Sequence, residues 1–296
     1  MDDTDSILPL LPKSALEYFE DIESSNKLYL KATSMRNCLE NIVDTIFKHI
    51  VEHDNINLNQ WNNKNLFNKL NFLEDYFPQE QYTSIHEIRL IGNKGAHQKN
   101  HNELTEDNIN ITLNNLSKLS EWTIIAYFKK YGFKTTSWLP IIFSTLQPIY
   151  RIRILEQYFD SLHIDKKLFI NHQEKIQYNT DNFILTSQED ITQQDIELDE
   201  IILVIDKLSM AYLKDKQYKK SIDFIENCFD KNIINERLKF EMLEKLNMLW
   251  KEIDRLPISN NIQDTKEKFD SIMKVVKEEE KTLFITLFTA VISQET

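Results

Sequence analysis

Apolar residues recur at every third or fourth position along most of the chain, which is the spacing of one face of an α-helix. The stripe is most regular from Cys38 to Val51. Stripes and helix-start signals together predict helices over residues 14–31, 38–51, 66–77, 83–91, 105–132, 149–159, 235–256 and 265–293. Ser14 and Thr105 are predicted N-caps, Gly132 is a predicted helix stop, and Pro140 or Pro148 is predicted in the first turn of a helix. The pattern therefore predicts an all-α protein, with an N-terminal helical bundle followed by a C-terminal helical unit.

Composition supports a helix-rich chain. Only three glycines and six prolines occur among 296 residues. Helices exclude both residues from their interiors, so this scarcity favours helix. With 41% hydrophobic residues, the chain is long enough for one large domain or two ordinary ones, each with a buried core.

Two polar stretches interrupt the apolar pattern. Asn and Gln dominate residues 53–65, and because their side chains compete with helical hydrogen bonds, we expect a loop there. Residues 186–200 are expected to form a linker or an exposed acidic face, and a short strand pair near Phe169 and Phe183 stays open. The expected organisation is a helical domain over 1–133, a connecting helix and linker over 134–199, and a helical domain over 200–296.

The last of these domains contains a segment that resembles one tetratricopeptide unit. Small and aromatic residues stand at the positions that such a repeat requires: Leu208, Tyr212, Tyr218 and Ser221. The closing proline is missing, and no second copy follows at the expected period. A helical hairpin within a bundle is the alternative, because a single unit cannot bury its own face.

The formal net charge of -12 argues against a protein that coats nucleic acid, because phosphate binding needs clustered Lys and Arg, although a local basic patch stays open. Cys38 and Cys228 form no CxxC pair and suit a reducing cytosol, where both would pack as small hydrophobic residues. The N-terminus is acidic, and no apolar run of about 18 residues occurs. We therefore expect a cytoplasmic protein that does not span a membrane.

The sequence offers no cofactor or metal motif. No phosphate-binding P-loop, dinucleotide fingerprint or nucleophile elbow occurs. His49 and His53, like His97 and His101, have the i, i+4 spacing of metal ligands, but neither pair belongs to an HExxH motif. We expect neither a cofactor nor a bound metal ion.

One segment departs from the rest of the chain. Gly92 and Gly95, two of its three glycines, flank Asn93 and Lys94. Glycine reaches positive φ without a steric penalty, and Asn tolerates left-handed backbone better than most residues. The segment therefore predicts either a sharp turn at the end of the helix that carries Arg89 or a close approach of another backbone.

The same segment resembles the signature of the domain of unknown function 4145 family, Ile-Arg-x-x-Gly-Asn-x-x-Ala-His. Five residues match it in order and spacing: Arg89, Gly92, Asn93, Ala96 and His97. The family's earlier Arg followed by Leu-Glu is similar to Arg36 through Glu40. The resemblance covers residues 15–130. It implies a helical bundle that occurs alone or fused to restriction-type and other defence enzymes.

This family is distantly similar to the HEPN superfamily, many of whose members are metal-independent ribonucleases. That similarity implies that Arg89 stabilises a charged phosphate and His97 transfers a proton. Seven residues, Leu90 to Ala96, separate the two, more than in HEPN nucleases, and Leu90 replaces the polar residue that normally follows the Arg. In a continuous helix the step from Arg89 to His97 would rise about 12 Å. A symmetric dimer would be another way to bring two such segments together.

A structural role and the binding of a nucleotide or nucleic acid are the alternatives for these residues. In the structural role, Arg89 would pair with a carboxylate such as Glu40 on the neighbouring helix, and His97 would hydrogen-bond a helix end or a loop carbonyl and hold the glycine turn. The expected function is then a non-enzymatic helical interaction or sensing module of a bacterial anti-phage defence or nucleic-acid-processing system, with a protein partner or a homodimer. A HEPN-type ribonuclease acting through Arg89 and His97 is the alternative function.

Overall fold

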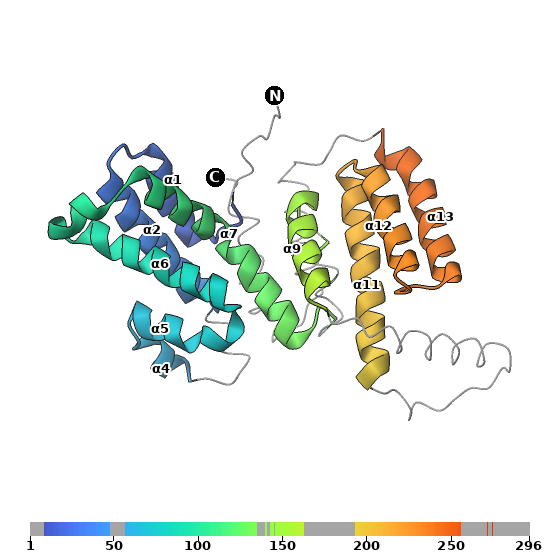
Figure 1. The fold of residues 1–296 in the computed structure, drawn as a ribbon, viewed down its shortest axis with the longest axis horizontal. Helices are drawn as coiled ribbons and strands as arrows, with labels where there is room; N and C mark the ends of the chain where they lie inside the picture. Colours follow the sequence, from blue (N-terminus) through green and yellow to red (C-terminus); the bar gives the residue numbers. More distant parts are fainter. Residues whose placement is uncertain are drawn as a thin grey trace. The chain divides into compact units, whose positions relative to one another are not determined.

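The structure is a computed structural model that describes residues 9–47, 57–134, 140, 143–144, 146–162, 193–255, 271 and 274. Every regular element in these residues is a helix, so the predicted all-α fold is confirmed (Figure 1). The chain divides into two compact units. Unit 1 comprises Met1–Lys130 and Asn261–Thr296, and unit 2 comprises Tyr131–Asn260.

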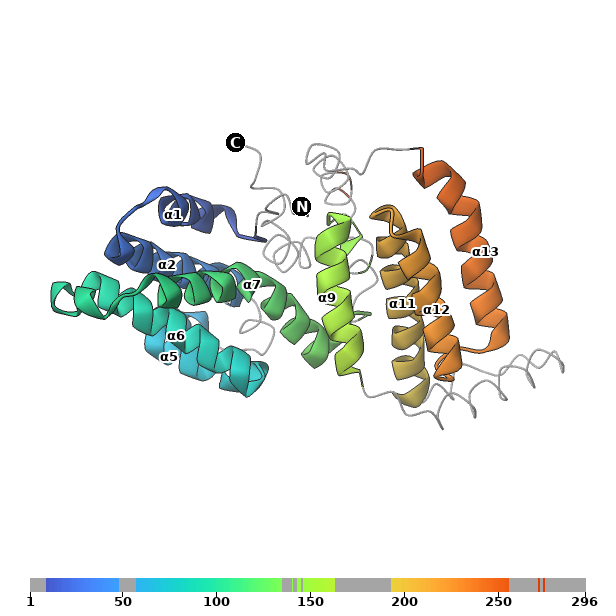
Figure 2. The ribbon, with the colours of Figure 1, turned by 45° about the horizontal axis from the view of Figure 1, so that its top comes forward.

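Helix α2, Leu28–Ile42, is the central element of unit 1. It packs against α1 (Lys13–Ser24) and α6 (Gln79–Ala96), and Figure 2 shows it between them. Cys38, Leu39 and Ile42 of the predicted apolar stripe are buried, and the buried face continues toward the start of the helix through Ala32 and Met35, which lie outside the predicted stripe. The remaining elements are a π-helix (Val43–Phe47), α4 (Leu58–Asn62), α5 (Leu66–Phe72), two 3-10 helices (Glu74–Tyr76 and Gln98–Glu103) and α7 (Glu106–Tyr131).

The single helix predicted over residues 14–31 is wrong, because α1 ends at Ser24 and α2 begins at Leu28. Between them, the Ser25 hydroxyl accepts a hydrogen bond from the Lys27 N–H at 3.2 Å, a local bond that competes with helix continuation. Ser14 is not the helix cap either. Pro12 occupies that position, and its carbonyl accepts the Ala15 N–H at 2.8 Å.

The loop predicted over residues 53–65 is also wrong in part, because α4 lies within it. Its asparagines act as caps: Asn57 accepts a hydrogen bond from the Asn59 N–H, and Asn65 accepts one from the Asn68 N–H, each at 2.9 Å. Trp61 on α4 is fully buried and lies edge-on to Phe72. Tertiary burial of one Trp side chain therefore outweighs the turn preference of the surrounding residues.

Helix α7 begins at the predicted cap. The Thr105 hydroxyl accepts the Asn108 N–H at 3.2 Å, and the Asn108 side chain accepts the Thr105 N–H at 3.1 Å, a capping box with Asn in place of Glu. Every residue from Leu119 to Phe128 is buried, so this part of α7 is covered on all sides. Gly132 follows the helix at a φ of 86°, which confirms the predicted stop.

Unit 2 is a series of helices in which each packs on the next. They are α9 (Pro148–Ser161), α11 (Gln193–Lys214), α12 (Tyr218–Asp230) and α13 (Glu236–Ile253). Pro148 occupies the first turn of α9, as predicted. Helices α11 and α12 form the expected helical hairpin, whose turn places Lys216 at a φ of 59°. Buried aliphatic residues such as Ile205, Leu213 and Ile225 form the core.

The polar stretch 186–200 was expected to be a linker or an acidic face, but α11 already begins at Gln193. Glu200 on α11 accepts hydrogen bonds from the Phe133 N–H at 2.7 Å and from the Tyr158 hydroxyl. Glu200, which falls in this expected linker or acidic face, is therefore part of the hydrogen bonding within unit 2. The predicted strand pair near Phe169 and Phe183 and the predicted helix over 265–293 lie outside the described residues.

Candidate functional site

Helix α6 continues without interruption through Gly92 and Gly95, so the predicted glycine turn is wrong. The close backbone approach is the correct explanation. A Cβ atom on Gly92 would lie 2.3 Å from the Cβ atom of Arg36, and one on Gly95 would lie 2.6 Å from the carbonyl oxygen of Tyr29. Both contacts are with α2. The glycines let two helices pack at closer range than side chains allow, which offsets the roughly 1 kcal/mol that glycine costs within a helix.

This crossing brings two arginines together. Arg36 on α2 lies opposite Gly92, and Arg89 precedes Gly92 by three residues on α6, which makes the two positions neighbours on the helix surface. Both arginine side chains are half-buried. Their Nε atoms are covered and have no hydrogen-bond partner within the described part of the chain.

The electrostatic surroundings of Arg89 are cationic. Burial lowers the pKa of Arg89, and the charge of Arg36 lowers it further. The predicted ion pair of Arg89 with Glu40 is wrong, because among the described residues neither arginine is within ion-pairing distance of a carboxylate. A guanidinium stays protonated at neutral pH even when its pKa falls, so two positive charges face each other here.

Aromatic side chains complete this region. The Arg89 guanidinium carbon lies 5.0 Å from the ring centre of Phe67 on α5. His86, one turn before Arg89 on α6, contacts Phe67 at 5.9 Å and Tyr82 at 4.7 Å between ring centres. Burial and the charge of Arg89 lower the pKa of His86, while Glu74 opposes them. We call Arg36, Phe67, His86 and Arg89 the arginine cluster.

Sequence reasoning found Arg36 and Arg89 but missed Phe67 and His86. Two signals could have identified these two residues. His86 precedes Arg89 by three residues, the spacing of neighbours on a helix surface. Phe67 leaves 45% of its surface exposed despite lying on a helix with an apolar stripe. The first signal was available in the sequence, whereas the second needed the packing of α5 on α6.

The structure does not place His97 with Arg89. His97 is the exposed residue that follows the last turn of α6, and the uninterrupted helix separates it from Arg89 by a rise of about 12 Å. The role predicted for His97, a hydrogen bond to a helix-end carbonyl, belongs to His101. A ring nitrogen of His101 lies 2.9 Å from the Gly95 carbonyl oxygen, and its ring stacks on Tyr29 at 4.5 Å.

Comparison with known proteins agrees with the motif. A family model described as "Domain of unknown function (DUF4145)" matches residues 24–136. Residues 24–136 are similar to this family, and we call them the DUF4145 domain. It contains the arginine cluster, both helix-packing glycines and the whole of α7. No curated protein and no solved structure matches the chain.

In the segments that the structure describes, no group of three or more His, Cys, Asp and Glu side chains could hold a metal ion. His49 and His53 lie outside those segments. None of the described helices combines the length and the hydrophobicity that crossing a membrane requires.

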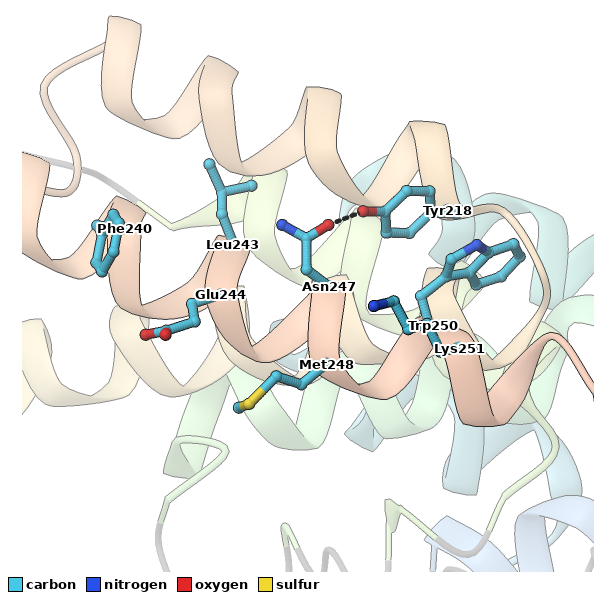
Figure 3. A pocket seen from close by; sticks show the side chains of 8 residues that line it. All are labelled: Tyr218, Phe240, Leu243, Glu244, Asn247, Met248, Trp250 and Lys251. Atoms are coloured by element: carbon cyan, nitrogen blue, oxygen red, sulfur yellow. Dashed lines mark hydrogen bonds between the residues drawn. The ribbon is translucent and has the colours of Figure 1, made fainter.

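Outside the DUF4145 domain, α13 carries a second candidate surface, an open groove of about 760 Å³ (Figure 3). The residues that line it come from α13, apart from Tyr218 on α12: Phe240, Leu243, Glu244, Asn247, Met248, Trp250 and Lys251. Most of them recur at i, i+3, i+4, i+7, i+8 and i+11, the spacing of a single helix face. We call this surface the α13 groove.

Two large apolar side chains of the α13 groove are exposed to solvent. Phe240 is 66% exposed and Met248 is 63% exposed. Between them and the end of the helix, Tyr218 stacks on Trp250 at 4.8 Å between ring centres and donates a hydrogen bond to Asn247 (Figure 3). The groove therefore has a fixed aromatic end and two large apolar side chains that are exposed to solvent.

Proposed function

We propose that this chain is a non-enzymatic helical interaction module that binds an amphipathic helix of a partner protein in the α13 groove. The exposure of Phe240 and Met248 carries this proposal. Large apolar side chains that cluster on an otherwise polar surface mark sites of protein interaction. Here they lie on the outer face of α13, whose opposite face, with Met242 and Leu246, is buried in the core of unit 2.

The spacing of the exposed residues favours a helix as the ligand. Phe240 and Met248 are eight residues apart on α13, a rise of about 12 Å or two turns. A partner helix presents anchors at the same interval when apolar residues recur along one of its faces. Leu243 and Trp250 lie half-buried along the groove and offer the surface into which such anchors would pack.

An exposed acidic residue in the groove favours a basic partner helix. Glu244 is exposed between Phe240 and Met248, so a complementary helix carries a basic residue between its two apolar anchors. The formal charge of -12 also attracts basic partners over longer distances and repels a second copy of the same chain. The occupant we propose is therefore a basic amphipathic helix of a different protein.

The biological setting is proposed from the family alone. Because resemblance to the DUF4145 family implies a domain that occurs alone or fused to restriction-type and other defence enzymes, we place this module in a bacterial anti-phage defence or nucleic-acid-processing system. In that setting, unit 2 would recruit the partner and the DUF4145 domain would serve in sensing.

The test uses the full chain with a photoreactive amino acid at position 248, cross-linked in its native host. The cross-linked peptide is sequenced, synthesised with a fluorescent label and titrated against the wild type and against a Phe240→Ser/Met248→Ser variant. We expect a basic amphipathic helix whose affinity falls at least about tenfold in the variant, because two buried anchors are lost. Ile111→Ser is the matched control, since Ile111 is 61% exposed but belongs to unit 1.

Two outcomes would overturn the proposal. One is a cross-linked peptide whose affinity is the same for the wild type and the double variant. The other is a cross-link to a second copy of this chain, together with a wild-type dimer that dissociates in the variant, as measured by light scattering. That second result would establish a homodimer instead.

The ribonuclease alternative has less support, because it needs Arg89 and His97 at one phosphate. The two residues are separated along a continuous helix, and a single chain does not bring them together. A second chain would have to supply the missing member of the pair.

A further inference from the structure

The arginine cluster lacks a counterion. Arg36 and Arg89 come from different helices, α2 and α6, which pack closely at Gly92. Most arginines in folded proteins that lose part of their hydration gain a carboxylate or carbonyl partner in return. In the described part of the chain, these two form no ion pair and no side-chain hydrogen bond, and the charge that acts on the pKa of Arg89 is that of Arg36.

We infer that Arg36 and Arg89 form a binding site for a phosphoryl group, a function of the DUF4145 domain that is independent of the α13 groove. Two guanidinium groups present planar pairs of donors that match the oxygens of a phosphate. A phosphate monoester carries close to two negative charges at neutral pH, which balances two arginines better than one carboxylate does. Both arginines are half-buried, and in each the covered nitrogen without a partner is Nε, which leaves the two terminal nitrogen atoms to meet the phosphate.

Contacts with Gly92 and Phe67 restrict the two arginines before the ligand binds. The Arg36 side chain starts from a backbone that the missing side chain of Gly92 allows to approach α6. The Arg89 guanidinium lies over the Phe67 ring at 5.0 Å, which limits where it can move. Because both side chains are constrained before binding, less conformational entropy is lost when the anion arrives.

Two carboxylates and one aromatic ring near the arginines affect how tightly a phosphoryl group can bind. Glu40 lies one turn beyond Arg36 on α2, and the charge of Glu74 acts on His86. Neither carboxylate pairs with an arginine within the described residues, so neither already occupies the site. Phe67 adds an aromatic surface that is 45% exposed next to the cations. A phosphate ester with a flat ring can use that surface, whereas free phosphate cannot.

The experiment is calorimetric titration of the full chain at low salt and pH 7.5 with three probes. These are inorganic phosphate, adenosine 5′-monophosphate and adenosine. Variants are Arg36→Gln, Arg89→Gln and the conservative Arg89→Lys, with Arg237→Gln as the matched control because Arg237 is exposed in unit 2 and pairs with Glu241. Circular dichroism of each variant verifies that it remains folded.

We expect phosphate-containing probes to bind the wild type and the control alike, with affinity at least about tenfold lower in Arg36→Gln and in Arg89→Gln. Arg89→Lys should fall between, since lysine keeps the charge but loses the planar pair of donors. Tighter binding of the nucleotide than of phosphate identifies a phosphate ester as the ligand, and equal binding identifies free phosphate. Two results would overturn the inference: no binding of either probe at millimolar concentration, or equal binding by folded Arg→Gln variants.

Discussion

Gly92 on α6 lies so close to Arg36 on α2 that a methyl group on the glycine would stand 2.3 Å from the arginine Cβ atom. Real Cβ atoms do not approach each other at that distance. The contact therefore fixes how near the two helices can pack. It also fixes where the Arg36 side chain leaves the helix, and so positions it beside Arg89.

Replacing Gly92 with alanine should destabilise the protein. Alanine favours an exposed helix by about 1 kcal/mol over glycine, but here the added methyl group forces α2 and α6 apart. Overpacking of this kind costs about 1–3 kcal/mol, so the midpoint of urea unfolding should fall. Glu87→Ala on the exposed side of α6 is the control and should change the free energy of unfolding by less than about 0.5 kcal/mol. A Gly92→Ala variant as stable as the wild type would show that the helices can separate without cost.

Local signals in the sequence predicted much of the fold. Thr105 caps α7, Gly132 ends it and Pro148 opens α9, because each of these depends only on residues nearby in the chain. Gly92 and Gly95 could not be assigned in the same way. A turn and a close helix crossing both require a missing side chain, and only the position of α2 distinguishes them.

The candidate site shows the same limit. The signature motif identified Arg89, but pairing it with Glu40 assumed that an opposite charge would lie across from it. The structure places Arg36 there, because the α2 backbone approaches α6 at Gly92. The contact of Phe67 with Arg89 depends on how α5 packs on α6, which no pattern within either helix specifies.

His86 should make stability depend on pH. Its pKa lies below the ordinary value of 6.5, because burial and Arg89 disfavour the charged ring more than Glu74 favours it. Between the lowered pKa and 6.5, the unfolded chain binds more protons than the folded chain, so the free energy of unfolding rises with pH.

On going from pH 7.5 to 5.5, the wild type should therefore lose more stability than a His86→Gln variant. Thermal melts at both pH values measure this difference. The exposed His97→Gln variant should behave as the wild type does, and an identical pH dependence in all three proteins would exclude His86 as the cause.

Both cysteines should be inert while the protein is folded. They are buried as predicted, and burial raises the pKa of Cys38 and of Cys228 to about 12. Since only the thiolate is nucleophilic, alkylation by iodoacetamide at pH 8 should be at least about 100-fold slower than in the unfolded chain. Mass spectrometry with and without denaturant counts the modified thiols. Rapid labelling of Cys38 in the folded protein would mean that α2 separates from its neighbours on the timescale of the reaction.

Glu200 should be important for the stability of unit 2. Its carboxylate accepts hydrogen bonds from the Phe133 N–H at 2.7 Å and from the Tyr158 hydroxyl, whose pKa is raised by burial and by this bond, so that the hydroxyl stays a donor. Removing the carboxylate in Glu200→Ala takes the acceptor from two donors at once, which should lower the free energy of unfolding by about 1–3 kcal/mol.

Two neighbouring variants separate this effect from a general loss of charge. Glu200→Gln keeps a side-chain oxygen that can accept from Phe133, so it should cost less than Glu200→Ala. Asp199→Ala removes only a surface ion pair with Lys134 at 2.9 Å and should cost less than about 1 kcal/mol. Urea unfolding followed by circular dichroism ranks the three. If Asp199→Ala proved as damaging as Glu200→Ala, the stabilisation would come from negative charge on this part of α11, and the two hydrogen bonds would not be its source.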